Sequence, residues 1–174
     1  MDGLVAAALQ AAAYRDRYRV LEDAAARVVV KNRANGTRNP HAERRQAVSA
    51  GEVLASPMVA WPLKALETPP LSDGACALVL AAGERAGALR RPAAWVRGLG
   101  WASDTYWREP EDLVNSRALA AAAERAYRMA GVQAPRREIG VAEVYDVTPY
   151  HELMAYEGLG FCGPGEGARF VGDG

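Results

Sequence analysis

The sequence predicts an α/β protein in which helices alternate with buried strands. Alanine-rich segments with apolar residues at helical spacing recur along the chain, and short continuous apolar runs bounded by turn residues lie between them. Runs of this second kind are typical of strands that are buried on both faces of a sheet. The alternation of the two patterns indicates layers of helices packed against sheets.

Two amphipathic helices are expected near the N-terminus. The first has apolar residues at helical spacing at Leu4, Val5, Ala8, Leu9 and Ala12. The second spans residues 20–31, and one face of it consists of Leu21, Ala24, Ala25 and Val28. Asn35-Gly36 is a typical helix-ending pair and predicts that this helix stops there.

Three shorter elements are expected in the middle of the chain. "SAGEVLAS" predicts a short helix, and "PMVAWPL" predicts an extended run between two prolines. The apolar run from Ala75 to Ala82 follows a Ser-Asp-Gly turn and ends at Gly83, so it predicts a strand buried on both faces. Cys76 lies inside this run and is therefore expected to be a buried, unreactive thiol.

The second part of the chain begins after the candidate boundary at residues 87–92. "AAWVRGLGWAS" predicts a strand, and a helix is expected from a cap at Asn115 or Ser116 to Ala130, with Gly131 as its stop. The inward residues of that helix are expected to be Leu119, Ala122, Ala126 and Ala130. "EIGVAEVYD" then predicts another strand and "TPYHELMAYEGLG" a helix with Pro149 in its first turn.

The turn between that last strand and helix carries the candidate site. Tyr145 and Asp146 would lie at the carboxyl edge of the sheet, where open α/β proteins bind ligands. The alternative is that Asp146 is only a helix cap and Tyr145 a half-buried aromatic side chain. The residues alone leave both interpretations open.

Several other side chains that could take part in catalysis or binding lie apart from this turn in the sequence. His41 and His151 lack the partners of a catalytic triad, and a position near a helix start favours neutral imidazole at His151. Cys162 precedes Gly-Pro-Gly and is expected to be more exposed than Cys76. The arginine-rich segment 37–45 is suited to binding the phosphates of coenzyme A, although a solvated loop that carries its own Glu43 is the alternative.

Composition and charge narrow the classes of function. Lys plus Arg and Asp plus Glu number 21 each, which argues against electrostatic binding of nucleic acid. The two cysteines lie far apart, so a disulfide scaffold is excluded and no metal site is expected. No apolar run reaches membrane-spanning length, and the N-terminus lacks the basic region of a signal peptide. We therefore expect a cytoplasmic protein.

Four segments resemble the thiolase superfamily, specifically its sterol-carrier or lipid-transfer branch. They are "VVVKNRANGTRNPHAERR", "GEVLASPMVAWPLKALETPPLSDGACALVLA", "EVYDVTPYHELMAYEGLGFCGPGEG" and "ARFVGDG". The resemblance implies an α/β fold with thiolase-like α/β/α/β/α layers, which would be incomplete here. Residues 1–89 would form the late part of the first thiolase half and residues 92–174 the early, truncated part of the second. It also implies a homodimer.

The same resemblance assigns a catalytic role to Tyr145. The family's histidine of the "H-D-x-F" motif, which helps to hold the thioester oxygen, falls on Tyr145 here. A phenol can donate a hydrogen bond or a proton at that place, but it is rarely a base. The region that carries the family's cysteine nucleophile has no counterpart in this chain, so neither Cys76 nor Cys162 inherits that role.

These departures make the chain similar to lipid-transfer homologues that act as aldolases on steroid side-chain coenzyme A thioesters. Those homologues use tyrosines in place of the thiolase cysteine and histidine, and they work with a zinc-ribbon and OB-fold companion that binds acyl-coenzyme A. The expected function is thus retro-aldol cleavage or thiolase-type acyl transfer on an acyl-coenzyme A substrate, with no bound cofactor. The alternatives are a non-catalytic lipid-transfer or acyl-coenzyme A-binding subunit and a truncated remnant.

Overall fold

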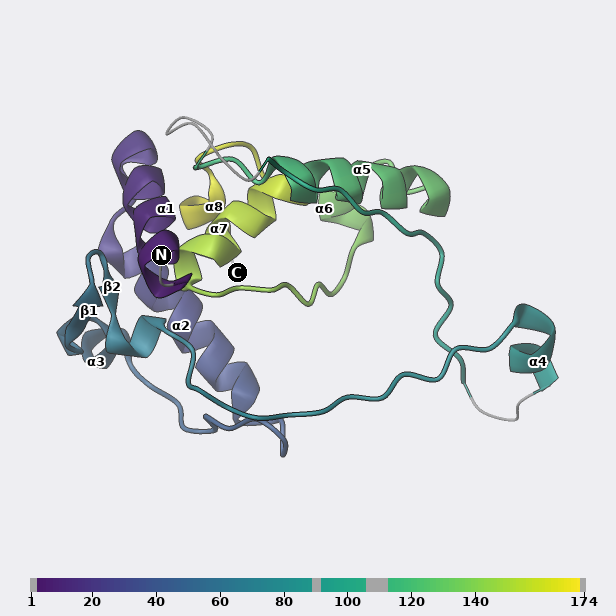
Figure 1. Cartoon of the computed structure of the whole chain (residues 1–174), viewed down its shortest axis with the longest axis horizontal. Helices are drawn as coiled ribbons and strands as arrows, with labels where there is room; N and C mark the ends of the chain where they lie inside the picture. The colour runs from purple at the N-terminus through teal and green to yellow at the C-terminus, as the bar shows by residue number, and fades with distance from the viewer. Residues whose placement is uncertain (1–2, 89–91, 106–112, 173–174) are drawn as a thin grey trace.

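The computed structural model describes residues 3–88, 92–105 and 113–172, and within these ranges the protein is mostly helical (Figure 1). The elements in chain order are α1 (Gly3–Tyr18), α2 (Glu22–Gly36), α3 (Ala50–Ala55), β1 (Met58–Ala60), β2 (Leu63–Lys64), the 3-10 helix η1 (Ala65–Glu67), α4 (Gly83–Ala88), α5 (Arg117–Ala130), α6 (Pro135–Glu138), α7 (Pro149–Gly158) and α8 (Gly167–Gly172). β1 and β2 form an antiparallel two-stranded sheet.

The main core lies where α1, α2 and α7 meet, and α8 packs on both α2 and α7. The buried face of α1 differs from the expected one, because Val5 and Leu9 are exposed. The residues that α1 buries are Ala7, Ala8, Ala11 and Tyr14. Small alanines let α1 approach the core closely, and the Tyr14 hydroxyl donates a hydrogen bond to Glu157 on α7. This polar partner explains why a tyrosine occupies the centre of the interface.

The N-terminal helices otherwise follow the sequence pattern. α2 buries Ala24, Ala25 and Val28, as expected, and it ends at Gly36. Leu21, by contrast, precedes α2 and is exposed. α3 begins with a capping box, in which Ser49 Oγ accepts a hydrogen bond from the Glu52 amide and Glu52 Oε2 accepts one from the Ser49 amide.

α5 has the predicted stop and the predicted face. Gly131 adopts the left-handed conformation with a φ of 76° and its amide donates to the Tyr127 carbonyl, so it ends the helix as expected. Ser116 is the N-cap residue, but its side chain makes no capping hydrogen bond. The four residues expected to face inward are half-buried, while Ala123 is buried.

A glycine-bearing extended segment lies directly on α5. A Cβ built on Gly98 would overlap backbone atoms of Ala126, and one built on Gly100 would overlap those of Ala122. The two glycines therefore allow the backbone of residues 98–100 to touch the helix backbone, which no other residue type would permit.

The three long strands expected from the sequence are not formed within the described residues. Residues 75–82, 93–103 and 139–144 are extended but have no ladder partner there, and Figure 1 shows the chain running out from η1 to α4 and back. Leu78 and Leu80 are 85% and 83% exposed, and Cys76 is exposed as well, so the expected burial of this run is wrong for this chain. An apolar run forms a buried strand only where neighbouring strands pair with its edges and other layers cover its faces.

Candidate functional site

The start of α7 is held by a buried histidine. Thr148 is the N-cap residue and Pro149 follows in the first turn, as expected, but the Thr148 side chain does not cap the helix. Its hydroxyl lies 2.8 Å from His151 Nδ1, and His151 Nε2 lies 2.9 Å from Gln10 Oε1. Burial lowers the pKa of His151, so neutral imidazole donates from Nε2 and accepts at Nδ1. Both ring nitrogens are satisfied, and His151 is a structural residue.

Asp146 belongs to a network of polar side chains between α2 and α7. Asn32 Nδ2 donates to Asp146 Oδ2 at 3.0 Å and to Glu152 Oε2 at 2.5 Å. Glu152 is buried, pairs with Lys31 at 2.7 Å and accepts a hydrogen bond from the Tyr156 hydroxyl. Asp146 therefore ties the turn to α2, and the interpretation of Asp146 as a mere helix cap is wrong.

The two carboxyl groups of this network differ in acidity. Burial raises the pKa of Asp146 to about 6, and the nearby Glu152 acts in the same direction. Burial opposes ionisation of Glu152 too, but hydrogen bonds from Lys31, Tyr156 and Asn32 outweigh it and lower the pKa of that carboxyl. Asp146 is thus the group that takes up a proton first as the pH falls.

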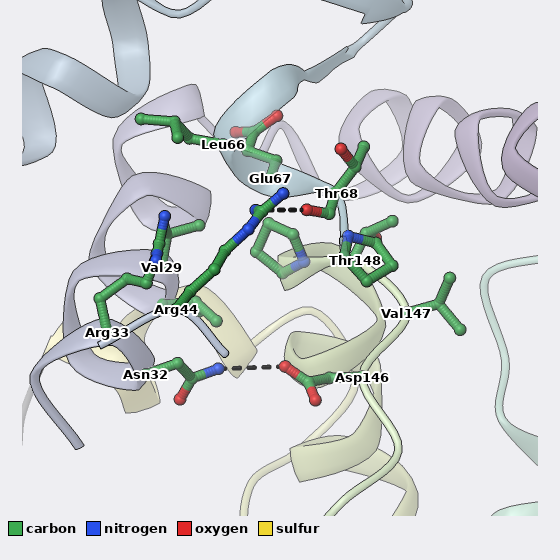
Figure 2. Close-up of a pocket in the computed structure, with 13 residues that line it drawn as sticks. Val29, Asn32, Arg33, Arg44, Leu66, Glu67, Thr68, Asp146, Val147 and Thr148 are labelled. Carbon is green, nitrogen blue, oxygen red and sulfur yellow. Dashed lines mark hydrogen bonds between the residues drawn. The ribbon is translucent and has the colours of Figure 1, made fainter. Parts of the chain in front are cut away.

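A pocket of about 200 Å³ opens beside this network (Figure 2). Asn32 and Arg33 on α2, Arg44 on the following segment, Thr68 and Asp146 contribute to its wall. Arg44 Nη1 donates to the Thr68 carbonyl oxygen at 2.9 Å. Segment 37–45, which contains Arg44, is recognisable in the sequence as arginine-rich. No sequence pattern indicates that Arg33 would line the same pocket.

Tyr145 lies next to this site in the chain, yet its side chain points elsewhere. It is 92% exposed, whereas the adjacent Asp146 turns toward α2. Opposite directions are expected for neighbours in an extended segment. The structure thus brings Asp146 together with polar partners and leaves Tyr145 accessible, and its catalytic role stays a prediction.

Cys162 does not have the surroundings of a nucleophile. Cys162 is half-buried, and burial raises the pKa of its thiol to about 11.

Asn32 and Lys31, which organise the carboxyl groups, were not singled out in the sequence, because a polar residue on an amphipathic helix carries no distinctive pattern.

Across the described ranges, no group of His, Cys, Asp or Glu side chains could hold a metal ion. None of the helices in these ranges has the length and the hydropathy of a membrane span.

Comparison with known proteins finds a family match for the second part of the chain and relatives that are similar over most of it. Residues 101–174 match the thiolase C-terminal domain-like family. The acetyl-CoA acetyltransferase of Methanothermobacter thermautotrophicus is 32% identical over 168 residues, which cover 96% of this chain and 43% of that protein. The steroid side-chain-cleaving aldolase of Thermomonospora curvata is 29% identical over 175 residues, or 96% of this chain and 44% of that protein.

The chain is also similar to a sterol carrier protein and to one chain of a solved structure. Sterol carrier protein 2 of Homo sapiens is 30% identical over 152 residues, which cover 84% of this chain and 27% of that protein. A chain of the solved Ltp2-ChsH2(DUF35) aldolase superposes with a TM-score of 0.89 at 28% identity, covering 97% of this chain and 45% of that chain. This chain spans less than half the length of these relatives. The resemblance to the thiolase superfamily seen in four sequence segments is confirmed by these matches, and the family match itself lies in residues 101–174.

Proposed function

We propose that this chain is part of an enzyme that acts on an acyl-coenzyme A thioester in lipid or steroid metabolism and cleaves a carbon–carbon bond by a retro-aldol reaction. In this proposal the chain contributes to a layered α/β/α/β/α thiolase fold, with residues 1–89 in the first half and 92–174 in the second. A homodimer and a zinc-ribbon and OB-fold companion protein belong to the same proposal. The similarity to a solved aldolase named for two components supports the companion.

The position of Tyr145 is the observation that carries the proposal. It follows the extended residues 139–144 and precedes α7, where the family resemblance puts a histidine that holds the thioester oxygen. Its hydroxyl is exposed and so remains accessible to a substrate. The similarity to a steroid side-chain-cleaving aldolase supports carbon–carbon cleavage rather than another reaction of coenzyme A thioesters.

The proposed reaction starts from a β-hydroxyacyl thioester. A base removes the proton of the β-hydroxyl, and the carbonyl group of the leaving ketone or aldehyde forms. The electron pair of the broken Cα–Cβ bond moves into the thioester, whose oxygen becomes an enolate oxygen. The Tyr145 hydroxyl donates a hydrogen bond to that oxygen, and protonation at Cα then gives the shortened acyl thioester. The base is not assigned to a residue of this chain.

Tyr145→Phe in the assembled enzyme tests this role. The substitution keeps the ring and removes the hydroxyl, so turnover should fall by about 10²–10³, with little change in stability. Tyr18→Phe is the matched control, because it removes a tyrosine hydroxyl on α1 and should leave turnover within about threefold. A Tyr145→Phe enzyme that keeps nearly full turnover would remove Tyr145 from the mechanism.

Thiolase-type acyl transfer is the second candidate, and the similarity to acetyl-CoA acetyltransferases favours it. The products separate the two reactions. Acyl transfer consumes free coenzyme A and yields two thioesters, whereas retro-aldol cleavage needs no free coenzyme A and yields one thioester and one ketone or aldehyde. A non-catalytic acyl-coenzyme A-binding subunit would bind the thioester and form neither set of products.

A further inference from the structure

Two guanidinium groups face the pocket between α2 and η1. Arg33 lies on α2 and Arg44 on the segment that follows it, and both line the cavity of about 200 Å³. In Figure 2 the Arg44 side chain crosses the pocket toward Thr68, whose carbonyl oxygen accepts its hydrogen bond. This contact fixes one corner of the guanidinium and leaves its other N–H groups for a ligand.

The two cations have no carboxylate counter-charge within residues 3–88, 92–105 and 113–172. Other arginines there do form ion pairs, for example Arg15 with Glu22 at 3.3 Å and Arg128 with Glu124 at 2.7 Å. Neither Arg33 nor Arg44 does so in that part of the chain. Burial lowers the pKa of Arg33, and the positive charge of Arg44 acts in the same direction. An anion between them would relieve this repulsion and supply acceptors.

Two carboxyl groups also line the pocket, but each has donors of its own. Asp146 Oδ2 accepts from Asn32 at 3.0 Å, and Glu67 Oε2 accepts from the Lys64 amide at 2.8 Å. Burial raises the pKa of both groups, that of Asp146 to about 6. These carboxyls therefore serve α2 and η1 rather than the arginine pair.

We propose that Arg33 and Arg44 bind a phosphate group in this pocket. Paired N–H donors of a guanidinium match two oxygens of a phosphate. The cavity of about 200 Å³ is smaller than the pockets of roughly 300–1,000 Å³ that enclose drug-sized ligands, so it suits one phosphate group rather than a whole coenzyme. The inference rests on the proposed function in that coenzyme A is one source of the phosphate, and inorganic phosphate is the other.

Calorimetric titration of the full chain with coenzyme A, and separately with inorganic phosphate, tests the site. In Arg33→Gln/Arg44→Gln the affinity for the bound probe should fall at least about tenfold, because two charge-assisted contacts are lost. Arg38→Gln/Arg45→Gln is the matched control, since both arginines are exposed in the same segment, and its affinity should stay within about threefold. Arg33→Lys/Arg44→Lys keeps the charge and should bind with intermediate affinity.

Each outcome decides between the sources or against the site. Loss of coenzyme A binding in the glutamine variant alone supports the site and assigns the phosphate to the coenzyme. Inorganic phosphate that binds through the same arginines, with no binding of coenzyme A, supports the site and contradicts the proposed function. Coenzyme A that binds the parent and the glutamine variant equally overturns the site and leaves the proposed function standing. Absence of binding of both probes at millimolar concentration also overturns the site. Should circular dichroism show that the glutamine variant is unfolded, the lysine variant decides.

Discussion

The side-chain amide of Asn32 on α2 donates a hydrogen bond of 3.0 Å to the carboxylate of Asp146, 114 residues further along the chain. The same nitrogen donates to Glu152 at 2.5 Å. One side chain thus holds both the turn before α7 and α7 itself against α2. It also brings two carboxyl groups together, and these repel each other when both are charged.

We expect Asp146→Asn to stabilise the protein at neutral pH and to have little effect at low pH. The pKa of Asp146 is raised from 3.8 to about 6 in the folded protein, so the folded state binds this proton more tightly than the unfolded chain. The stability contributed by that proton is complete below the unfolded value and is lost as the pH rises through about 6. Asparagine carries no charge and avoids this loss, which is on the order of 1 kcal/mol for a partly exposed group.

Urea unfolding at a series of pH values, at low protein concentration, measures this effect. The difference in free energy of unfolding between Asp146→Asn and the parent should grow from near zero at acid pH to its full value above neutrality. Glu152, whose pKa is lowered, contributes with the opposite sign, but it is present in both proteins and largely cancels in the difference. Parallel stability curves would show that Asp146 does not bind a proton preferentially in the folded state.

Gly100→Ala should separate residues 98–100 from α5. The added Cβ would overlap the backbone of Ala122, so the segment has to move, at a cost of about 1–3 kcal/mol. Gly140→Ala is the matched control, because a Cβ at Gly140 meets nothing within 4 Å. Thermal unfolding and hydrogen exchange of α5 amides report the loss, and equal midpoints for the two variants would contradict this packing.

The two cysteines should react in the reverse order of the sequence-based expectation. Cys76 is exposed, whereas burial raises the pKa of Cys162 to about 11 and so reduces its thiolate fraction. Alkylation near pH 8, followed by mass spectrometry, should label Cys162 about 10- to 100-fold more slowly than Cys76. The single variants Cys76→Ser and Cys162→Ser assign the two rates. Slow labelling of Cys76 would instead show that residues 75–82 are covered in solution.

The purified chain should self-associate through its exposed extended segments. Leu78 and Leu80 lie in an apolar run without a ladder partner in the described residues, and such strands pair with other chains. Leu78→Glu/Leu80→Glu should therefore shift sedimentation toward the monomer. Leu21→Glu, at a single exposed leucine before α2, should leave the distribution unchanged. A monodisperse monomer of the parent would contradict the prediction.

Local signals in the sequence predicted the helices better than the sheets. The Asn35-Gly36 pair, Pro149 and Gly131 each act within a few residues of their own position, and each marks a helix end in the structure. A strand at 75–82 would depend instead on distant strands that pair with its edges and on layers that cover its two faces, and within the described residues those faces are open. The apolar pattern was recognised correctly, but the burial that it usually accompanies was not found.

The site shows the same limit. The turn at residues 145–148 was found because a strand pattern meets a helix start there. Its partners on α2 were missed, since hydrogen bonds across 114 and 120 residues leave no periodic signal in a single sequence. The face of α1 was misplaced for a related reason, because its alanines and Tyr14 fit a particular neighbouring surface, whereas hydrophobicity alone favoured Val5 and Leu9.

The glycine pair at 98 and 100 makes the length of its segment as important as its composition. Side chains alternate along an extended chain, so inserting or deleting one residue just before Gly98 would turn Leu99 and its alternate neighbours toward the backbone of α5. Replacements at Arg97, Leu99 and Trp101 change the open side and leave the helix contact intact. A library built on this protein can therefore vary those three positions, provided that glycine stays at positions 98 and 100 and that no residue is inserted or deleted just before them.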